Sequence, residues 1–197
     1  QTAQIYVRER VESRNIQRGS SGVVLFVHGA GTPAEVAFDV PSGDYSWMAY
    51  LARAGFDVFS MDMTGYGRSS RPAAMNDACN FLAAQQSQFV PGLIPSPCAP
   101  SHPAPMSTME SDWNDIDKVV DHLRALRRVD KVSLVGWSQG GPRTGGYALR
   151  NPEKVARLVV LAPSYVRAGP PALPSQPFTD AGSMTAQSRK DFVANWD

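Results

Sequence analysis

The stretch Val132 to Gly141, with the sequence VSLVGWSQGG, constrains the fold of this chain most strongly. An apolar run typical of a buried strand leads into Gly136-Trp137-Ser138-Gln139-Gly140, and a segment with helical character follows. A serine on a sharp turn between a strand and a helix exposes its hydroxyl, and small residues two positions to either side let the backbones pass closely. The pattern Gly-x-Ser-x-Gly also occurs by chance in glycine-rich turns. The flanking strand and helix nevertheless favour Ser138 as a candidate nucleophile.

Apolar runs and periodicity predict alternating strands and helices along the rest of the chain. Strands are expected at residues 5–11, 23–27, 57–61, 132–135 and 157–161. One helix should follow Ser46 as its N-cap, with an apolar face of Trp47, Tyr50, Leu51 and Ala54. A second should begin near Ser107 with a capping box to Glu110, and bury a stripe of Trp113, Ile116, Val119, Val120, Leu123 and Leu126.

This alternation specifies an α/β fold, with a mostly parallel, doubly wound sheet and helices on both faces. In such sheets ligands bind at the carboxyl ends of the strands. A third helix is expected from the Ser138 turn to about Arg150, and a further one over residues 185–196.

Composition excludes several classes of partner. The 197 residues carry 19 basic and 18 acidic side chains, so the formal net charge is +1. No cluster of Lys and Arg suggests nucleic acid or an anionic membrane surface. No apolar run approaches the ~20 residues that span a bilayer. No metal or organic cofactor is implied, because no group of His, Cys and carboxylate residues has the spacing of a ligand set.

The two cysteines, Cys79 and Cys98, lie in one irregular segment. They are either bridged, where closing the loop would contribute ~3 kcal/mol, or unpaired thiols in a cytosolic protein. A proline-rich loop gains most from such a bridge, which favours an oxidising compartment, secreted or periplasmic.

The long segment 72–106 separates two predicted elements. Loops longer than ~15 residues are usually functional or disordered, and this one follows the carboxyl end of a strand. We expect it to help form the substrate entrance, with apolar lining from Phe81, Phe89, Leu93 and Ile94. Trp137, beside Ser138, would border the same pocket or serve only in packing. The alternative is a solvated insertion that does not contact substrate.

Three motifs occur in the order HGAG (residues 28–31), DMTGYGRS (62–69) and GWSQGG (136–141). Together they resemble the α/β-hydrolase superfamily over about residues 5 to 162. The resemblance implies an oxyanion hole built from the backbone N–H groups of Gln139 and Ala30, with Gly31 as the alternative second donor. It also implies that His28 and Asp62 shape loops and are not members of a catalytic triad.

A serine at position 138 argues against the haloalkane dehalogenases and epoxide hydrolases of this superfamily, which place a carboxylate there. The resemblance favours a serine esterase that cleaves a carboxylic ester through an acyl-enzyme on Ser138. An amidase, a carbon–carbon bond hydrolase, an acyltransferase or a cofactor-free haloperoxidase would use the same turn.

A serine nucleophile also needs a histidine base and an orienting carboxylate. The resemblance places both after strand 157–161, where Ala162-Pro163-Ser164-Tyr165 offers no carboxylate. We therefore expect a hydrolase core over residues 1–162 that is incomplete at its C-terminus, and the start of a cap over residues 163–197. A companion C-terminal segment would supply the acid, the histidine and the strands that cover the apolar run 158–161. The alternative is a catalytically inactive binding module of the same fold.

Overall fold

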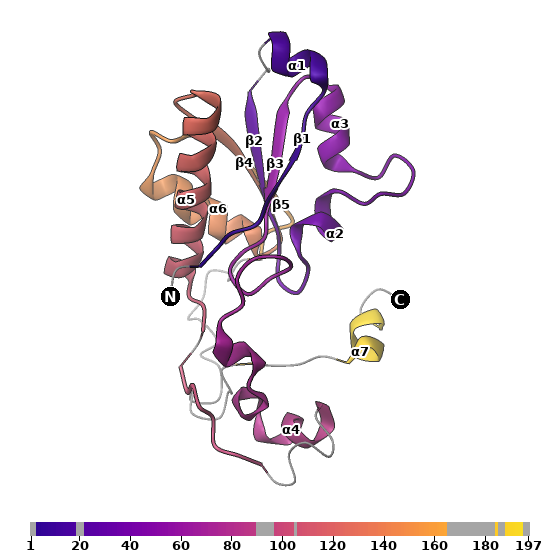
Figure 1. Ribbon diagram of the computed structural model, residues 1–197, viewed down its shortest axis with the longest axis vertical. Coiled ribbons are helices and arrows are strands. Elements are labelled where there is room, and N and C mark those ends of the chain that lie inside the picture. The colour runs from indigo at the N-terminus through magenta and orange to yellow at the C-terminus, as the bar shows by residue number, and fades with distance from the viewer. Residues whose placement is uncertain are drawn as a thin grey trace. The chain divides into compact units, whose positions relative to one another are not determined.

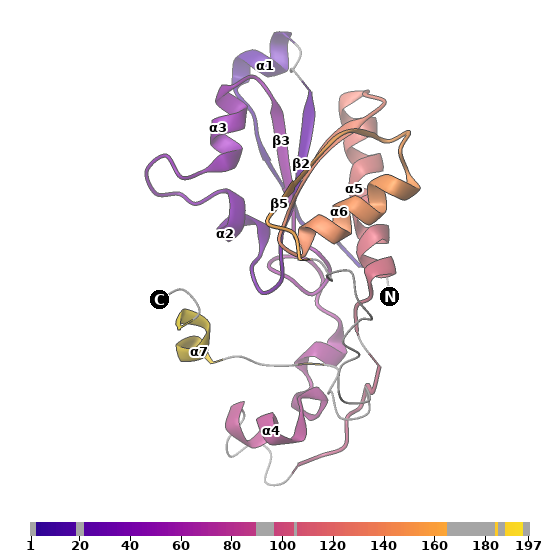
Figure 2. The ribbon, with the colours of Figure 1, turned by 180° about the vertical axis from the view of Figure 1, so that it is seen from behind.

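A computed structural model describes residues 3–18, 22–89, 97–104, 106–164, 184 and 188–194 (Figures 1 and 2). Contacts divide the chain into two compact units. The first comprises residues 1–71 and 108–165, and the second comprises residues 72–107 and 166–197. Each unit is described by itself.

The first unit is built on a five-stranded sheet. Its strands are β1 (Val7–Arg10), β2 (Val23–Val27), β3 (Asp57–Met61), β4 (Val132–Trp137) and β5 (Val155–Leu161), in the spatial order β1-β3-β2-β4-β5. β1 runs antiparallel to β3 and all other neighbours are parallel. The predicted strands are all present. β2 and β3 are buried along their whole length, as continuous apolar runs in a parallel sheet require.

Helices cover both faces of this sheet. α5 (Met109–Arg127) and α6 (Gly140–Arg150) lie on one side, and α2 (Ala34–Phe38) and α3 (Trp47–Arg53) lie on the other (Figures 1 and 2). A short helix, α1 (Ser13–Arg18), connects β1 to β2. Successive side chains of β2 point to opposite faces of the sheet and belong to two hydrophobic cores. Leu25 packs in the core with α5, and Phe26 packs in the core with α2 and α3. The predicted mostly parallel α/β sheet is confirmed, and no described helix is long and apolar enough to cross a membrane.

The start of α5 differs from the prediction by one residue. Thr108, not Ser107, is the N-cap, and its side chain accepts a hydrogen bond from the Ser111 N–H. The Ser111 hydroxyl accepts from the Thr108 N–H, so Ser111 takes the place expected of Glu110. Leu126, expected in the buried stripe, is exposed at the C-terminal end of the helix.

The buried face of α3 also differs from the prediction. Ser46 caps the helix as expected and accepts a hydrogen bond from the Ala49 N–H. However, Met48 and Ala52 face the core, while Trp47 is 46% and Tyr50 65% exposed. α2 and α3 pack mainly against β1, β2 and β3, and no described helix packs against the exposed apolar side chains of α3.

β5 forms one edge of the sheet, with an exposed apolar surface. Leu158, Val159, Val160 and Leu161 are all exposed, between 37% and 52%. Val159 also lines an open groove of about 520 Å³ together with α3 residues. The other lining residues are Phe26, Asp44, Ser46, Trp47, Tyr50, Leu51 and Val135. The continuous aliphatic run 158–161 is typical of an interior strand, but no strand among the described residues pairs with the outer edge of β5.

The second unit contains the segment between β3 and α5. Two 3-10 helices, η1 (Ala73–Asn76) and η2 (Ala78–Asn80), precede α4 (Ala83–Phe89). The predicted C-terminal helix is described as α7 (Arg189–Val193), and the other residues of the predicted span, except Ser188 and Ala194, lie outside the described residues.

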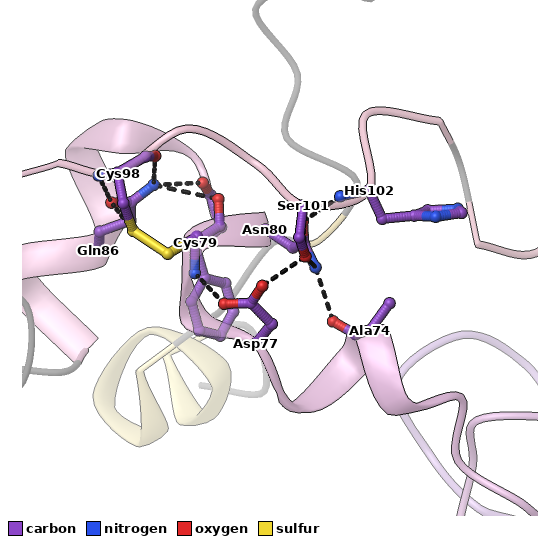
Figure 3. The surroundings of a disulfide bond; sticks show 9 residues. Ala74, Asp77, Cys79, Asn80, Gln86, Cys98, Ser101 and His102 are labelled. Atoms are coloured by element: carbon purple, nitrogen blue, oxygen red, sulfur yellow. Dashed lines mark hydrogen bonds between the residues drawn. A yellow bond between two sulfur atoms is a disulfide. The ribbon is translucent and has the colours of Figure 1, made fainter.

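Cys79 and Cys98 form a disulfide, which settles the alternatives left open by the sequence (Figure 3). The buried Gln86 side chain crosses the loop that the disulfide closes. Its amide donates to the carbonyls of Cys79 (3.2 Å) and Cys98 (3.0 Å), and its oxygen accepts from the Cys98 N–H (2.8 Å). Asn80 is fully buried and accepts a hydrogen bond from the His102 N–H at 2.8 Å. The segment is therefore an organised unit and not a fully solvated loop.

Replacing both cysteines by serine should destabilise this second unit alone. The disulfide restricts the unfolded chain and so contributes ~3 kcal/mol to the free energy of unfolding of this unit. In the double variant, the backbone N–H of residue 98 should therefore exchange with solvent about 100-fold faster. Amide hydrogen exchange measures this, and the amides of β2 serve as the internal control. Unchanged exchange at Cys98 would mean that Gln86 holds the loop without the disulfide.

Candidate active site

Ser138 lies in a strained turn between β4 and α6. Its φ is 53°, a left-handed conformation that side chains other than glycine rarely adopt. Three backbone hydrogen bonds hold it. The Ser138 N–H donates to the Leu161 carbonyl (2.9 Å), and the Ser138 carbonyl accepts from the N–H groups of Gly141 (2.9 Å) and Ser164 (3.1 Å). Such strain persists only where the surroundings determine the conformation, and it concentrates at functional sites.

The glycines around Ser138 are required by close contact. A Cβ on Gly136 would lie 2.3 Å from the Gly140 carbonyl oxygen, and a Cβ on Gly140 would lie 2.2 Å from the Val27 carbonyl oxygen. A Cβ on Gly29 would lie 2.9 Å from the Ser138 Cβ and 3.3 Å from its Oγ. The loop after β2 therefore lies directly against the Ser138 side chain, and a larger residue at Gly29 would clash with it.

His28 is fully buried and uses both ring nitrogens within the protein. Nε2 accepts from the Met63 N–H at 3.1 Å, so the proton is on Nδ1, which lies 2.7 Å from the Gly29 carbonyl. Burial, with a smaller contribution from the charge of Arg143, lowers the pKa of His28 from 6.5 to about 4. The imidazole is thus a neutral connection between two loops, as expected, and is not available as a general base.

Asp62 is a loop-fixing carboxylate, also as expected. Its two oxygens accept from the N–H groups of Ala34 (2.8 Å) and Arg68 (2.9 Å). It therefore joins the start of α2 to the loop after β3. Gly67 in that loop has φ 49°, and a Cβ there would overlap the Asp62 carboxylate.

The sequence-predicted oxyanion donors lie on the two backbones that meet at Ser138. Ala30 follows Gly29 in the loop after β2, and Gln139 follows Ser138 as the N-cap of α6. Ala30 is exposed and Gln139 is half-buried. Within the part of the chain that the structure describes, no group accepts a hydrogen bond from the N–H of Ala30, Gln139 or Gly31.

The predicted lining residues are only partly described. The Trp137 ring packs edge-on against Phe38 with centroids 6.5 Å apart, so it contributes to the α2/α3 core. The side chain of Phe89, and all of Leu93 and Ile94, lie outside the described residues. Phe81 forms an isolated bridge with Met184 inside the second unit.

The other two histidines lie on elements other than the Ser138 turn. His122 is exposed on α5 and lines a groove with Ala3, Ile5 and Val7. His122 lies ten positions, or ~15 Å along the axis of α5, after Asp112, the α5 residue that pairs with Arg143 of α6. His102 belongs to the second unit, and its ring points away from Asn80 and Ser101 in Figure 3. No group of three or more His, Cys, Asp or Glu side chains among the described residues is arranged to hold a metal ion.

Sequence reasoning missed one charged pair beside this turn. Arg143 of α6 and Asp112 of α5 are both buried, and their side chains pair at 2.6 Å. Burial raises the pKa of the Asp112 carboxyl, and the Arg143 charge opposes that shift. The sequence feature that could have indicated this pair is an arginine within the run of small residues GGPRTGG, residues 140–146, which begins two positions after Ser138.

Alanine at two glycines of α6 should have opposite effects. Gly140→Ala should lower the free energy of unfolding by at least ~2 kcal/mol, because its Cβ would overlap the Val27 backbone. Gly145→Ala is the matched control, because nothing lies within 4 Å of the new Cβ, and it should gain about 0.5 to 1 kcal/mol. Urea unfolding measures both, and equal stability of the two variants would contradict the described turn.

His28 should make stability depend on pH between about 4 and 6.5. Since its pKa is lowered in the folded state, the unfolded chain binds the proton first as the pH falls. The contribution is fully present above pH 6.5 and should decrease by about 3 kcal/mol as the pH approaches 4. Urea unfolding across this range, with His122→Gln as the control, measures the slope. An NMR titration that shows His28 becoming protonated near pH 6.5 would contradict the neutral assignment.

Comparison with known proteins places this arrangement in a family. Solved structures with the same fold include one from a study of carboxylesterases of Nitrososphaera gargenis. It is 18% identical with a TM-score of 0.53, and the match covers 83% of this chain and 43% of that chain. Epoxide hydrolase I of potato (Solanum tuberosum) matches with 20% identity and a TM-score of 0.51, over 85% of this chain and 39% of that chain.

Among curated proteins, 1-acylglycerol-3-phosphate O-acyltransferase ABHD5 of Rattus norvegicus is 27% identical over 106 residues. The match covers 54% of this chain and about a fifth (21%) of that relative. The family model for the alpha/beta hydrolase fold matches residues 22–195, which include the Ser138 turn and both loops beside it. The chain therefore belongs to the alpha/beta hydrolase fold family.

Proposed function

We propose that this protein is a serine hydrolase that cleaves a carboxylic ester through an acyl-enzyme on Ser138. The observation that carries the proposal is the left-handed conformation of Ser138 in a turn whose glycines are in close contact. This geometry supports a nucleophile elbow, which would present the hydroxyl above the carboxyl end of the sheet. A carboxylate nucleophile, which would favour epoxide or haloalkane chemistry, is not present at this position.

The oxyanion of the tetrahedral intermediate would be bound by the N–H groups of Ala30 and Gln139. Both belong to backbones that meet at Ser138, and no described residue accepts a hydrogen bond from either of them. Gln139 also stands at the positive end of the α6 dipole, which favours negative charge there. A single donor of this kind contributes a factor of ~10² to 10³ in kcat.

The general base and its carboxylate would come from a segment beyond these residues. His28 is neutral with both nitrogens engaged, and His122 lies along α5 away from the turn. Among the described residues, no side chain forms a hydrogen bond with the Ser138 hydroxyl. A companion segment that places a histidine on Ser138 would complete the triad.

Two uncovered apolar surfaces support such a companion. Among the described residues, no strand pairs with the outer edge of β5, which lies beside four exposed aliphatic side chains that a further parallel strand would bury. The groove between Trp47 of α3 and Val159 of β5 would accept a helix against the uncovered part of the sheet. Large apolar patches of this kind mark interaction surfaces.

We propose an ester as the substrate class. Attack of Ser138 on an ester releases the alcohol, and water then hydrolyses the acyl-enzyme; an amide would react by the same two steps and release an amine. The carboxylesterase among the similar structures agrees with this chemistry. The curated relative is named as an acyltransferase. On this chain, acyl transfer would begin with the same acylation of Ser138 and end with an alcohol acceptor in place of water. Acyl transfer is therefore the second candidate.

A fluorophosphonate probe should label the protein at Ser138 and not in the Ser138→Ala variant. The probe forms a stable bond only with a serine whose base and oxyanion donors are in place. Residues 1–197 alone should label at least ~100-fold more slowly than the same residues together with the companion segment, because the base is missing. Intact-mass analysis of every polypeptide in the native preparation measures both the labelling and the presence of the companion.

Two results would overturn parts of this proposal. Equal labelling by residues 1–197 alone would show that the base lies within them, and the companion would be unnecessary. If the complete native protein is folded and contains Ser138 but is not labelled, the proposal of an enzyme is wrong and the protein is a binding module of the same fold.

A further inference from the structure

Arg143 is a buried cation that the proposed reaction does not yet use. It lies in the second turn of α6, five positions after Ser138, and is 4% exposed. Arginine is almost never this buried unless it is paired, because removing its charge from water is costly. Its partners therefore indicate what the residue does.

The guanidinium joins three parts of the first unit. Its Nε donates to the Asp112 carboxylate in the first turn of α5 at 2.6 Å, and its Nη1 donates to the His28 carbonyl at 3.2 Å. The Gly29 carbonyl lies 3.5 Å from the same nitrogen, and the Tyr66 ring lies 5.9 Å from the guanidinium carbon. Arg143 thus donates to one carbonyl of the loop that lies against Ser138 and has a longer contact with the next, whose shorter partner is the His28 Nδ1 at 2.7 Å.

Holding the Gly29 carbonyl also determines the direction of the next N–H group. The carbonyl of Gly29 and the N–H of Ala30 belong to one planar trans peptide, so they point in opposite directions. The carbonyl faces the buried side, where the His28 Nδ1–H at 2.7 Å and Arg143 meet it. The Ala30 N–H must therefore point out of the protein interior, on the exposed side of the loop.

This peptide needs an external anchor. Gly29 has no Cβ because a side chain there would clash with Ser138, and glycine rotates freely about its backbone bonds. Rotation of the Gly29–Ala30 peptide would turn the N–H inward and place the carbonyl oxygen where an oxyanion has to bind. An anion and a carbonyl oxygen repel, so the rotated form would lose this donor.

We infer that Arg143, oriented by Asp112, is a positioning residue that keeps the Ala30 N–H directed outward as an oxyanion donor. The inference rests on the proposed function, since it assigns a role within that same site. Arg143 does not touch the reacting atoms and acts only through the peptide that it holds. A fixed donor contributes most in the transition state, so its loss lowers kcat with little effect on KM.

The experiment compares variants of the complete native protein with p-nitrophenyl butyrate as substrate. Arg143→Met should lower kcat by about 10²-fold or more and change KM by less than about 3-fold. Arg150→Met is the matched control, because Arg150 on the same helix stacks on Trp113 at 3.6 Å and does not contact the loop. It should keep the kcat of the wild type.

Arg143→Lys separates positioning from simple charge pairing. A lysine has one nitrogen, which can pair with Asp112 but does not bridge to the loop carbonyls as the guanidinium does. We expect a melting temperature near that of the wild type with kcat still reduced at least 10-fold. Recovery of both quantities by lysine would mean that Arg143 only neutralises Asp112, and the inference would be wrong.

A crystal structure of Arg143→Met supplies a readout that does not depend on activity. The Gly29–Ala30 peptide should be rotated or should adopt two orientations, while Arg150→Met should keep one. If Arg143→Met does not fold, the structure of Arg143→Lys takes its place. An unchanged peptide with wild-type kcat overturns this inference but leaves the proposed function standing. Absence of labelling at wild-type Ser138 overturns the proposed function, and the peptide orientation then still decides whether Arg143 holds the loop.

Discussion

The close approach of three backbones at Ser138 determines most of this structure. The end of β4, the start of α6 and the loop after β2 come so near one another that no Cβ fits at Gly136, Gly140 or Gly29. This crowding forces the chain to turn sharply and holds Ser138 at a positive φ. A hydroxyl placed this way projects away from the packed backbones, so the same constraint that shapes the fold also exposes the candidate nucleophile.

The sequence predicted the parts of the fold whose physical cause is local. β2 and β3 are continuous apolar runs, and their burial on both faces follows from the helices on each side. The glycine spacing around Ser138 predicted the turn for the same reason, since only close backbone contact requires glycine there. The capping box of α5 was shifted by one residue because Ser107, Thr108 and Ser111 all carry suitable hydroxyls, and backbone geometry selects among them.

Features that depend on partners distant in sequence could not be predicted in this way. The apolar face of α3 was assigned to Trp47 and Tyr50 because their spacing fits a helix, but Met48 and Ala52 fit it too. Which set is buried depends on where the sheet lies. Arg143 and Asp112 were missed for a related reason, because a charged residue on a helix is expected to face solvent until a buried partner is known.

The candidate site and the uncovered edge of the sheet are physically connected. Two of the three backbone hydrogen bonds that hold Ser138 involve Leu161, the last residue of β5, and Ser164 shortly after it. The strained turn therefore depends on a strand whose outer edge pairs with no described residue and whose apolar side chains are exposed. Strain of this size, of order 1–3 kcal/mol, persists only where neighbouring structure restrains it. Pairing of a further strand with β5 would restrain Leu161, and through it the conformation of Ser138. A strand added at this edge would thus also hold the candidate nucleophile in place.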